Sequence, residues 1–272
     1  MRILLVSNYY KEATQEVAYQ TVELLTKRGI QVEVDNEQEV VLEQSNFDII
    51  IVFGGDGTIL RATRKYAICG APVLGVNMGT VGFLSNIEVH ELEHYLPRLL
   101  EHSYHLDERM ILQVSVQNTD GSSHQGCCLN EMVVKSVDHQ LNNINVEIDS
   151  DQVGNYRGDG LMVATPTGST AYSLSCGGPV VDPELEVLLI TPIASQILSR
   201  KPMVVGGNKV IKLSSTDRHD HVIRLDGQIE IPWELNAIVT VKKADYKLKL
   251  INLKSTSFFD HIDTRLRRSE EL

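Results

Sequence analysis

The ten residues from Ile49 to Thr58 read IIIVFGGDGT, an apolar run that passes directly into glycines. Such a short run of branched apolar residues predicts a buried parallel strand over Ile49–Phe53. The composition of Ile59–Ala67 predicts a helix, so the glycines lie where a strand ends and a helix begins. At this kind of junction the helix dipole and the backbone N–H groups attract anions, and glycine lets a phosphate approach the backbone. The stretch therefore predicts a phosphate-binding turn.

One carboxylate, Asp56, lies in the middle of this turn. An acid beside a phosphate repels the ligand unless it binds a metal or takes a proton from a hydroxyl, which favours phosphoryl transfer to an alcohol. The alternative for these five residues is a plain loop with a capping Asp. The chain has no Gly-Lys pair and hence no Walker A motif. Its Rossmann fingerprint is incomplete, because Leu60 stands where the third glycine belongs.

The composition excludes several classes of protein. The chain has 272 residues, of which 42% are hydrophobic, enough for one large domain or two of ordinary size. Its net charge of −11 argues against a nucleic-acid partner, because such a partner requires a basic face. The apolar run at the N-terminus is too short for a signal peptide, and no run approaches the roughly 18 apolar residues of a membrane span. We therefore expect a cytoplasmic protein without a membrane partner.

The four cysteines and one histidine pair are the residues to weigh as metal ligands. The cysteines Cys69, Cys127, Cys128 and Cys176 have no metal-ligand spacing, which favours free thiols in a cytosolic protein. The segment from His90 to His94 reads HELEH and formally matches the zinc-protease pattern. Leucines mark the opposite, buried face of this helix, so we expect both histidines to be solvated. The sequence singles out no metal-binding residues in the protein.

Strand and helix patterns alternate over the first hundred residues. The predicted strands cover residues 2–6, 31–34, 48–53 and 71–76, and a helix near residues 13–25 stops at Gly29. This alternation predicts a Rossmann-like, doubly wound α/β domain with its ligand site at the carboxyl ends of the strands. Asp56 lies at such an end. A second glycine-bearing loop, residues 77–85, follows another strand, but a plain connection explains it equally well.

From about residue 104 helical periodicity fades and short strands separated by turn residues appear. The predicted strands cover residues 110–117, 127–135, 144–148, 152–156, 161–164, 186–190, 203–205, 210–214, 222–225, 237–242 and 247–251. This pattern predicts an antiparallel, β-rich sandwich. We expect an α/β domain at residues 1–103 and a β-rich domain at 104–254. The amphipathic tail at 255–272 is a candidate for packing back on the first domain.

A second group of polar residues lies in the β-rich half. Asn130 and Glu131 stand side by side within a strand-like run, where successive side chains face opposite ways. Residues 165–175 crowd hydroxyl groups around Tyr172, and hydroxyls donate to or accept from a purine, ribose or phosphate. Tyr172 offers a flat face for stacking, and Asp159 lies between two glycines, where it could accept from a ligand amide or bind a cation. The alternative is a Ser/Thr-rich linker, which the flanking apolar strands make a poor fit.

At this point the segments resemble those of a known family, the NAD kinases, over about residues 1–255. The matching segments are residues 54–58, 75–85, 130–131, 157–160, 165–179 and 225–228. The glycine turn alone is not specific, because lipid kinases and phosphofructokinases carry a similar one. Asn-Glu followed by TPTGSTAYSLS is highly specific. The resemblance implies ATP-dependent phosphorylation of the 2′-hydroxyl on the adenosine ribose of NAD, giving NADP.

The resemblance also implies roles for individual residues. Asp56 is then the general base at the 2′-hydroxyl. Asn130 and Thr170 contact the adenine, and Glu131 contacts the ribose. Asp159 holds the nicotinamide end, and the residues beside it are Ala171, Tyr172 and Ser175. The remaining residues assigned to substrate or nucleotide binding are Gly54, Gly55, Gly57, Arg61, Arg157, Thr167, Ser173, Leu174, Ala194 and Gln228.

The same resemblance implies NAD and ATP as substrates and Mg²⁺ carried with the ATP. It implies a homodimer or homotetramer with the β-rich domains in the interface. Two alternatives stay open on the residues alone: a diacylglycerol-type lipid kinase that shares the glycine turn, and a non-catalytic dinucleotide-binding regulator. One departure concerns Arg200, which many relatives place directly before a proline, whereas here Lys201 intervenes.

Overall fold

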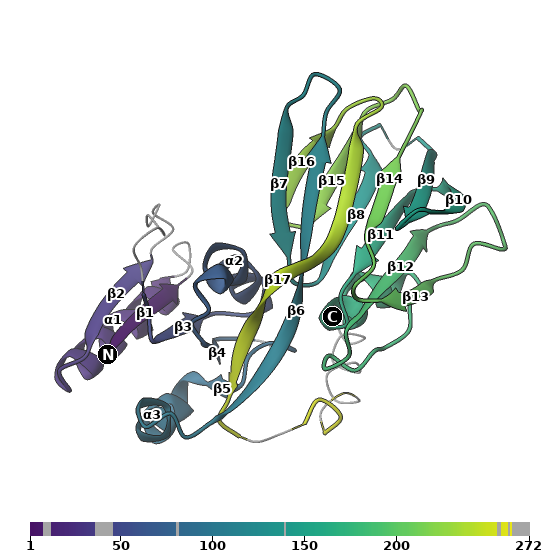
Figure 1. Cartoon of the computed structure of the whole chain (residues 1–272). Helices are drawn as coiled ribbons and strands as arrows, with labels where there is room; N and C mark the ends of the chain where they lie inside the picture. Colours follow the sequence, from purple (N-terminus) through teal and green to yellow (C-terminus); the bar gives the residue numbers. More distant parts are fainter. Residues whose placement is uncertain are drawn as a thin grey trace. The chain divides into compact units, whose positions relative to one another are not determined.

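The computed structural model describes residues 1–7, 12–35, 46–79, 82–138, 140–254, 257–260 and 262. The chain divides into two compact units, Met1–Arg109 together with Tyr246–Leu272, and Met110–Asp245 (Figure 1). The predicted boundary at residue 103 and the predicted packing of the tail remain predictions, and most of the tail lies outside the described residues. The predicted fold class, an α/β part followed by an antiparallel β-rich part, is confirmed.

A parallel sheet forms the centre of the first unit. Its strands are β1 (Arg2–Ser7), β2 (Gln31–Asp35), β3 (Ile49–Phe53) and β4 (Val73–Asn77), in the spatial order β2-β1-β3-β4. All five residues of β3 and of β4 are buried, as expected for parallel strands that are covered on both faces. The helices of this unit are α1 (Glu12–Thr26), α2 (Asp56–Tyr66) and α3 (Leu92–Leu100), with short 3-10 turns η2 (Ala67–Cys69) and η3 (Val89–Glu91).

The free edge of β4 is covered by two segments. The short strand β5 (Ile87–Glu88) pairs in parallel with its end, and Leu250 of the long strand β17 (Ile238–Asn252) pairs with Val73. The side chain of Asn86 fastens the end of β17, because its amide donates to Asn252 at 3.1 Å and its oxygen accepts from the Leu253 N–H at 2.8 Å. The chain therefore returns to the first sheet after it has built the second unit.

The second unit is a sandwich of two antiparallel sheets. One sheet has the order β13-β12-β11-β8-β15-β16, and the other β10-β9-β14-β17, with β6 beside β17 and β7 beside β6. The inner faces of the strands share one apolar core, which includes Leu112, Val134, Val146, Ile190 and Trp233. The strands that begin the unit are β6 (His105–Gln117), β7 (Ser123–Cys128), β8 (Glu131–Ser136), β9 (Asn142–Ile148), β10 (Asp151–Gly158) and β11 (Gly160–Ala164). The rest are β12 (Val187–Ile193), β13 (Met203–Gly206), β14 (Ile211–Ser214), β15 (His221–Leu225) and β16 (Ile229–Trp233).

The structure corrects several predicted strands. The single strand predicted at 127–135 is broken at Leu129 and Asn130, and its halves β7 and β8 belong to different sheets. The two strands predicted at 237–242 and 247–251 form one continuous strand, β17, in which the intervening Ala244 is buried. The strand β16 was not predicted, and its sequence contains Pro232, which argues against a central strand. Proline is tolerated at the edge of a sheet, and β16 is the edge strand of its sheet.

The histidine pair of the HELEH segment lies where the sequence predicts it. His90 and His94 are exposed, whereas Leu92, Leu96 and Leu99 are buried on the other face of the segment. His90 lies 3.4 Å from the Glu88 carboxylate, which is also exposed. The solvated reading of this pair is confirmed.

Candidate active site

The glycine turn connects β3 to α2, as the sequence predicts. Gly55 is the N-cap of α2, and Asp56 is the first helical residue. A Cβ atom at Gly54 would overlap the side chain of Thr58, so only glycine fits there. Gly55 and Gly57 are exposed at the helix N-terminus, where α2 presents its first N–H groups. This turn has the elements of an anion-binding site.

The carboxylate of Asp56 is held in a fixed orientation by the loop that follows β4. The backbone N–H of Phe83 donates to Oδ2 of Asp56 at 2.8 Å, and that of Leu84 donates to Oδ1 at 3.1 Å. A Cβ atom at Gly82 would overlap this carboxylate, so glycine allows the close approach. The loop that the sequence left open, as either a site element or a plain connection, therefore positions the predicted base.

Arg61, which is predicted to bind substrate or nucleotide, lies in the second turn of α2. Its guanidinium donates to the carbonyl oxygen of Ser7 at the end of β1, at 2.8 Å. This bond ties α2 to the carboxyl end of the neighbouring strand. The carboxyl ends of β1 and β3 and the N-terminus of α2 thus lie together, as in doubly wound folds.

In the second unit, one buried carboxylate organises the Asn130-Glu131 turn. Asp226 accepts the backbone N–H of Leu129 at 3.1 Å, of Asn130 at 2.7 Å and, weakly, of Glu131 at 3.4 Å. Its own N–H donates to the Glu131 carbonyl. These bonds replace the ladder that a continuous strand would make, which is why the predicted strand breaks here. Asp226 lies in one of the segments that resemble the family, but its sequence indicates no role for it.

The hydroxyl-rich segment folds directly onto this turn. The Thr165 N–H donates to the Asn130 carbonyl, and the Thr165 hydroxyl donates to the Leu129 carbonyl at 2.5 Å. Gly168 packs so closely on Asn130 that a Cβ atom would overlap the Asn130 backbone. The 3-10 turn η4 (Thr167–Thr170) therefore lies beside Asn130, and Thr170 donates to the Thr167 carbonyl at 3.3 Å. The structure brings Asn130 and the predicted Thr167 and Thr170 together.

Glu131 is the most perturbed acid of this group. Its side chain is buried, and its Oε2 atom has no hydrogen-bond partner among the described residues. Burial, reinforced by repulsion from Asp226, raises the pKa of Glu131 to about 8. The Thr167 hydroxyl is also buried without a partner among those residues. Two unsatisfied polar groups in one region are a feature of functional sites, where a ligand completes the hydrogen bonding.

A second group of predicted residues meets at the start of β11. Gly158 packs against the carbonyl groups of Ile193 and Ala194, and the Asp159 N–H donates to the Ile193 carbonyl at 2.9 Å. The side chains of Arg157 and Asp159 are exposed on either side of Gly158. Ala194 has a positive φ of 46°, which is uncommon for a residue other than glycine. The structure therefore places Arg157, Asp159 and Ala194 side by side.

The residues of the short helix α4 (Tyr172–Ser175) differ in exposure. Tyr172 packs against Val133, Met162 and Ile193, and Lys135 donates to its hydroxyl at 2.8 Å. Ser173 is fully buried and its hydroxyl pairs with that of Thr191 at 3.0 Å, so its side chain supports the helix. Ser175 is exposed, and Leu174 and Ala171 are partly buried.

Gln228, which belongs to the predicted set, and Arg200, which does not, lie at the edges of the unit. Gln228 is exposed in the hairpin between β15 and β16, two residues after Asp226. Arg200, whose role the sequence left open, donates to the Asn155 carbonyl at 3.1 Å and lies over the Tyr156 ring at 5.2 Å. In the structure Arg200 packs on β10.

These features define a class of protein. The first unit has a strand, a glycine turn and a helix with a fixed carboxylate. The second unit has a hydroxyl-rich segment beside two buried polar groups, of Glu131 and Thr167, that lack hydrogen-bond partners among the described residues. Together these features are typical of a nucleotide-dependent phosphotransferase. Comparison with known proteins identifies the family. The family descriptions "ATP-NAD kinase N-terminal domain" and "ATP-NAD kinase C-terminal domain" match residues 37–104 and 129–253.

Individual relatives of the chain support the same family. The NAD kinase of Heliobacterium modesticaldum is 40% identical over 78% of this chain and 76% of its own length. The NAD kinase of Natranaerobius thermophilus is 31% identical over 98% of each chain. A crystal structure of an NAD kinase from Archaeoglobus fulgidus in complex with ATP superimposes with a TM-score of 0.80, 29% identity and coverage of 98% and 99%. The chain belongs to the NAD kinase family.

Proposed function

We propose that this chain transfers the γ-phosphate of ATP to the 2′-hydroxyl of the adenosine ribose of NAD, giving NADP. The observation that carries the proposal is the Asp56 carboxylate, which two backbone N–H groups hold at the N-terminus of α2 in a member of the NAD kinase family. A general base must be oriented toward the hydroxyl it deprotonates, and this carboxylate is held in one orientation. Gly54, Gly55 and Gly57 line the phosphates in this proposal.

We assign the residues of the second unit to the dinucleotide. Asn130 and Thr170 contact the adenine. The buried Glu131 carboxyl bonds the ribose, and its unsatisfied Oε2 supports that role. Asp159 holds the nicotinamide end, with Ala171, Tyr172 and Ser175 beside it. The further contacts that we propose come from Arg61, Arg157, Thr167, Ser173, Leu174, Ala194 and Gln228.

We further propose that Mg²⁺ enters as the complex with ATP, since phosphate oxygens and waters are its preferred ligands. We expect a homodimer or homotetramer in the cytoplasm. Within the described residues, none of the helices has the length and apolar character that a membrane crossing requires.

The test is incubation of the purified chain with ATP, Mg²⁺ and NAD, with NADP measured by a dehydrogenase that accepts only NADP. Parallel reactions replace NAD with diacylglycerol in mixed micelles. We expect NADP to form and diacylglycerol to stay unphosphorylated. Phosphorylation of the lipid without NADP formation would support the lipid-kinase alternative, and tight NAD binding without either product would support the regulator.

A further inference from the structure

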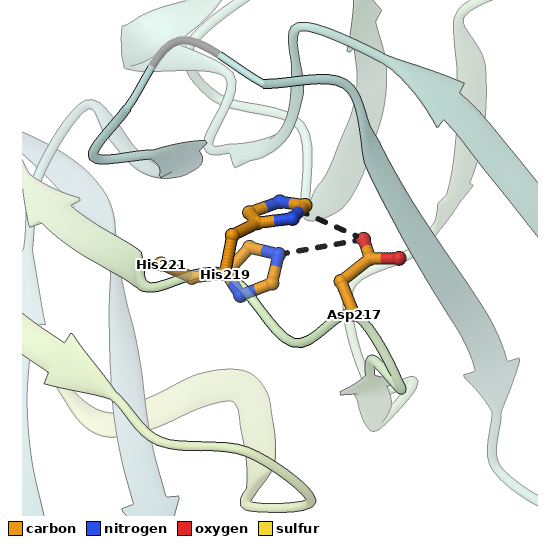
Figure 2. Close-up of side chains that lie close together, drawn as sticks. All are labelled: Asp217, His219 and His221. Atoms are coloured by element: carbon orange, nitrogen blue, oxygen red, sulfur yellow. Dashed lines mark ion pairs between the residues drawn. The ribbon is translucent and has the colours of Figure 1, made fainter.

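Three ionisable side chains outside the predicted active site meet in the second unit: Asp217, His219 and His221 (Figure 2). Their donor atoms all lie within 4.8 Å of one another. His221 is the first residue of β15, whereas Asp217 and His219 lie in the connection from β14. Because β14 and β15 belong to different sheets, this connection crosses from one sheet of the sandwich to the other.

The two imidazole rings point at one carboxylate oxygen, at ion-pair distances that are too long for hydrogen bonds (Figure 2). Nε2 of His221 lies 3.6 Å from Oδ2 of Asp217, and Nε2 of His219 lies 3.8 Å from the same oxygen. Hydrogen bonds between nitrogen and oxygen span about 2.7–3.2 Å, so both separations are too long. Both Nε2 atoms are buried without a hydrogen-bond partner among the described residues, and the His221 side chain is only 4% exposed. The arrangement therefore leaves two buried nitrogen lone pairs or N–H groups unsatisfied.

A metal ion would satisfy all three groups at once. Two atoms bound to the same tetrahedral zinc at about 2.1 Å are about 3.4 Å apart. The two nitrogen–oxygen separations of 3.6 and 3.8 Å exceed this value by a few tenths of an ångström. All three donor atoms lie within 4.8 Å of one another, so the side chains would have to move inward by up to about an ångström to bind one ion. Two imidazoles and one carboxylate are a donor set that zinc and related divalent ions bind in proteins.

We propose that Asp217, His219 and His221 form a binding site for a divalent transition-metal ion, with zinc the favoured ion and water as the fourth ligand. The site is distinct from the Mg²⁺ that accompanies ATP. It is also distinct from the exposed His90 and His94 of the HELEH segment.

The surroundings of the three residues suit a metal site. The backbone N–H of Asn143 donates to Oδ2 of Asp217 at 2.6 Å, and its side-chain amide donates to Oδ1 at 2.9 Å. Such outer bonds orient ligating carboxylates in metal sites. Burial would raise the pKa of Asp217, but the Asn143 bonds and the neighbouring His219 hold that pKa below its ordinary value.

The position of the site indicates a structural role. Asp217 is bonded to Asn143 of β9 in one sheet, and His221 begins β15 in the other. An ion held by Asp217 and His221 would clamp the two sheets at the end of the sandwich. The buried Trp233 ring lies 5.1 Å from the His221 ring, so His221 packs against the apolar core of the sandwich. The opposite end of β15 leads into Asp226, which holds the Asn130-Glu131 turn.

The test uses the full chain, stripped of metal by a chelator and dialysed into metal-free buffer. Zinc binding is measured by calorimetric titration. In a second experiment Co²⁺ takes the place of zinc, because its visible absorption spectrum reports the number of ligands. The melting temperature is measured with and without zinc. We expect one ion per chain, a four-coordinate Co²⁺ spectrum, and a higher melting temperature with zinc. Asp217→Asn and His219→Gln should each weaken zinc binding at least about tenfold and remove the thermal shift.

The control is the double variant His90→Gln with His94→Gln, which removes two exposed imidazoles and should bind zinc as the unaltered chain does. Far-ultraviolet circular dichroism confirms that each variant is folded. His219→Gln and Asp217→Asn are preferred to a His221 change because they are less buried and similar in shape. The proposal is overturned if micromolar zinc does not saturate the chain, if folded cluster variants bind zinc unchanged, or if only the His90 and His94 variant loses binding.

Discussion

Glu131 buries a carboxyl group at the turn that carries the predicted adenine contact, and its pKa of about 8 makes the stability of the fold depend on pH. The folded-state pKa lies above the unfolded value of 4.5, so the folded state retains a proton that the unfolded state loses between these pH values. The free energy of unfolding should therefore fall with rising pH in this window, at most by about 1.4 kcal/mol per pH unit, and level off above it.

The matched variant is Glu131→Gln, which keeps the shape and cannot ionise. Urea unfolding of both proteins from pH 5 to pH 9 isolates the contribution of this group, because all other titrating groups are shared. We expect the variant to gain stability relative to the unaltered chain as the pH rises toward 8. Parallel pH profiles for the two proteins would show that Glu131 ionises normally.

Asn130 and Thr170 are predicted to read the adenine rather than to take part in proton transfer. Replacing each by Ala should weaken NAD affinity more than it slows the chemical step, because the lost contacts are made in the ground state as well. Calorimetry gives the affinity, and single-turnover kinetics give the chemical step. Thr119→Ala, at an exposed position, is the control. An unchanged affinity in both variants would rule out the adenine assignment.

The loop after β4 is the element that orients Asp56. Gly82→Ala should slow turnover by at least about tenfold, because its new Cβ would displace the carboxylate from the Phe83 and Leu84 N–H groups. Gly79→Ala, in the same loop but with open space around the new Cβ, should leave turnover nearly unchanged. The steady-state rate of NADP formation is measured for both variants, and their melting temperatures show whether each is folded. Equal rates in the two variants would show that the loop does not control Asp56.

The elements that the sequence predicted best are those with strong local patterns. The buried run of β3, the glycines before α2 and the leucine stripe of α3 carry their structure in their own residues. The break between β7 and β8 could not be predicted, because it depends on Asp226, which lies almost a hundred residues later. The continuity of β17 likewise depends on distant partners, since β14, β6 and β4 all pair with it.

For the molecule as a whole, we expect turnover to depend on Mg²⁺ and thermal stability to depend on zinc. Removing Mg²⁺ should abolish NADP formation, because the phosphates of ATP then lack their counter-charge. A zinc-selective chelator should leave turnover at ambient temperature unchanged while it lowers the melting temperature, since the cluster at Asp217 is structural in our proposal. Rates and melting curves measured on one preparation under both treatments test this. Loss of turnover on zinc removal alone would give zinc a catalytic role instead.

As with the strands and helices, the parts of the site that depend on local sequence could be predicted, and the parts that depend on distant residues could not. The glycine turn and the hydroxyl-rich segment are contiguous, so their residues could be named in advance. The orienting contacts of Asp56 and the role of Asp226 could not, because both join segments far apart in the chain. The meeting of Asp217, His219 and His221 was also missed. Its only local signal is the alternating Asp-x-His-x-His spacing of residues 217–221, which ends at the first residue of β15.

The most direct measurement of the central claim is the turnover number of the Asp56→Asn variant, with NAD affinity measured on the same preparation. The carboxamide keeps the size of the side chain but cannot take a proton from the ribose hydroxyl. We expect turnover to fall about 10²–10⁴-fold while NAD binding stays largely intact. Full activity in a folded variant would contradict the account, because the 2′-hydroxyl would then need no base at this position.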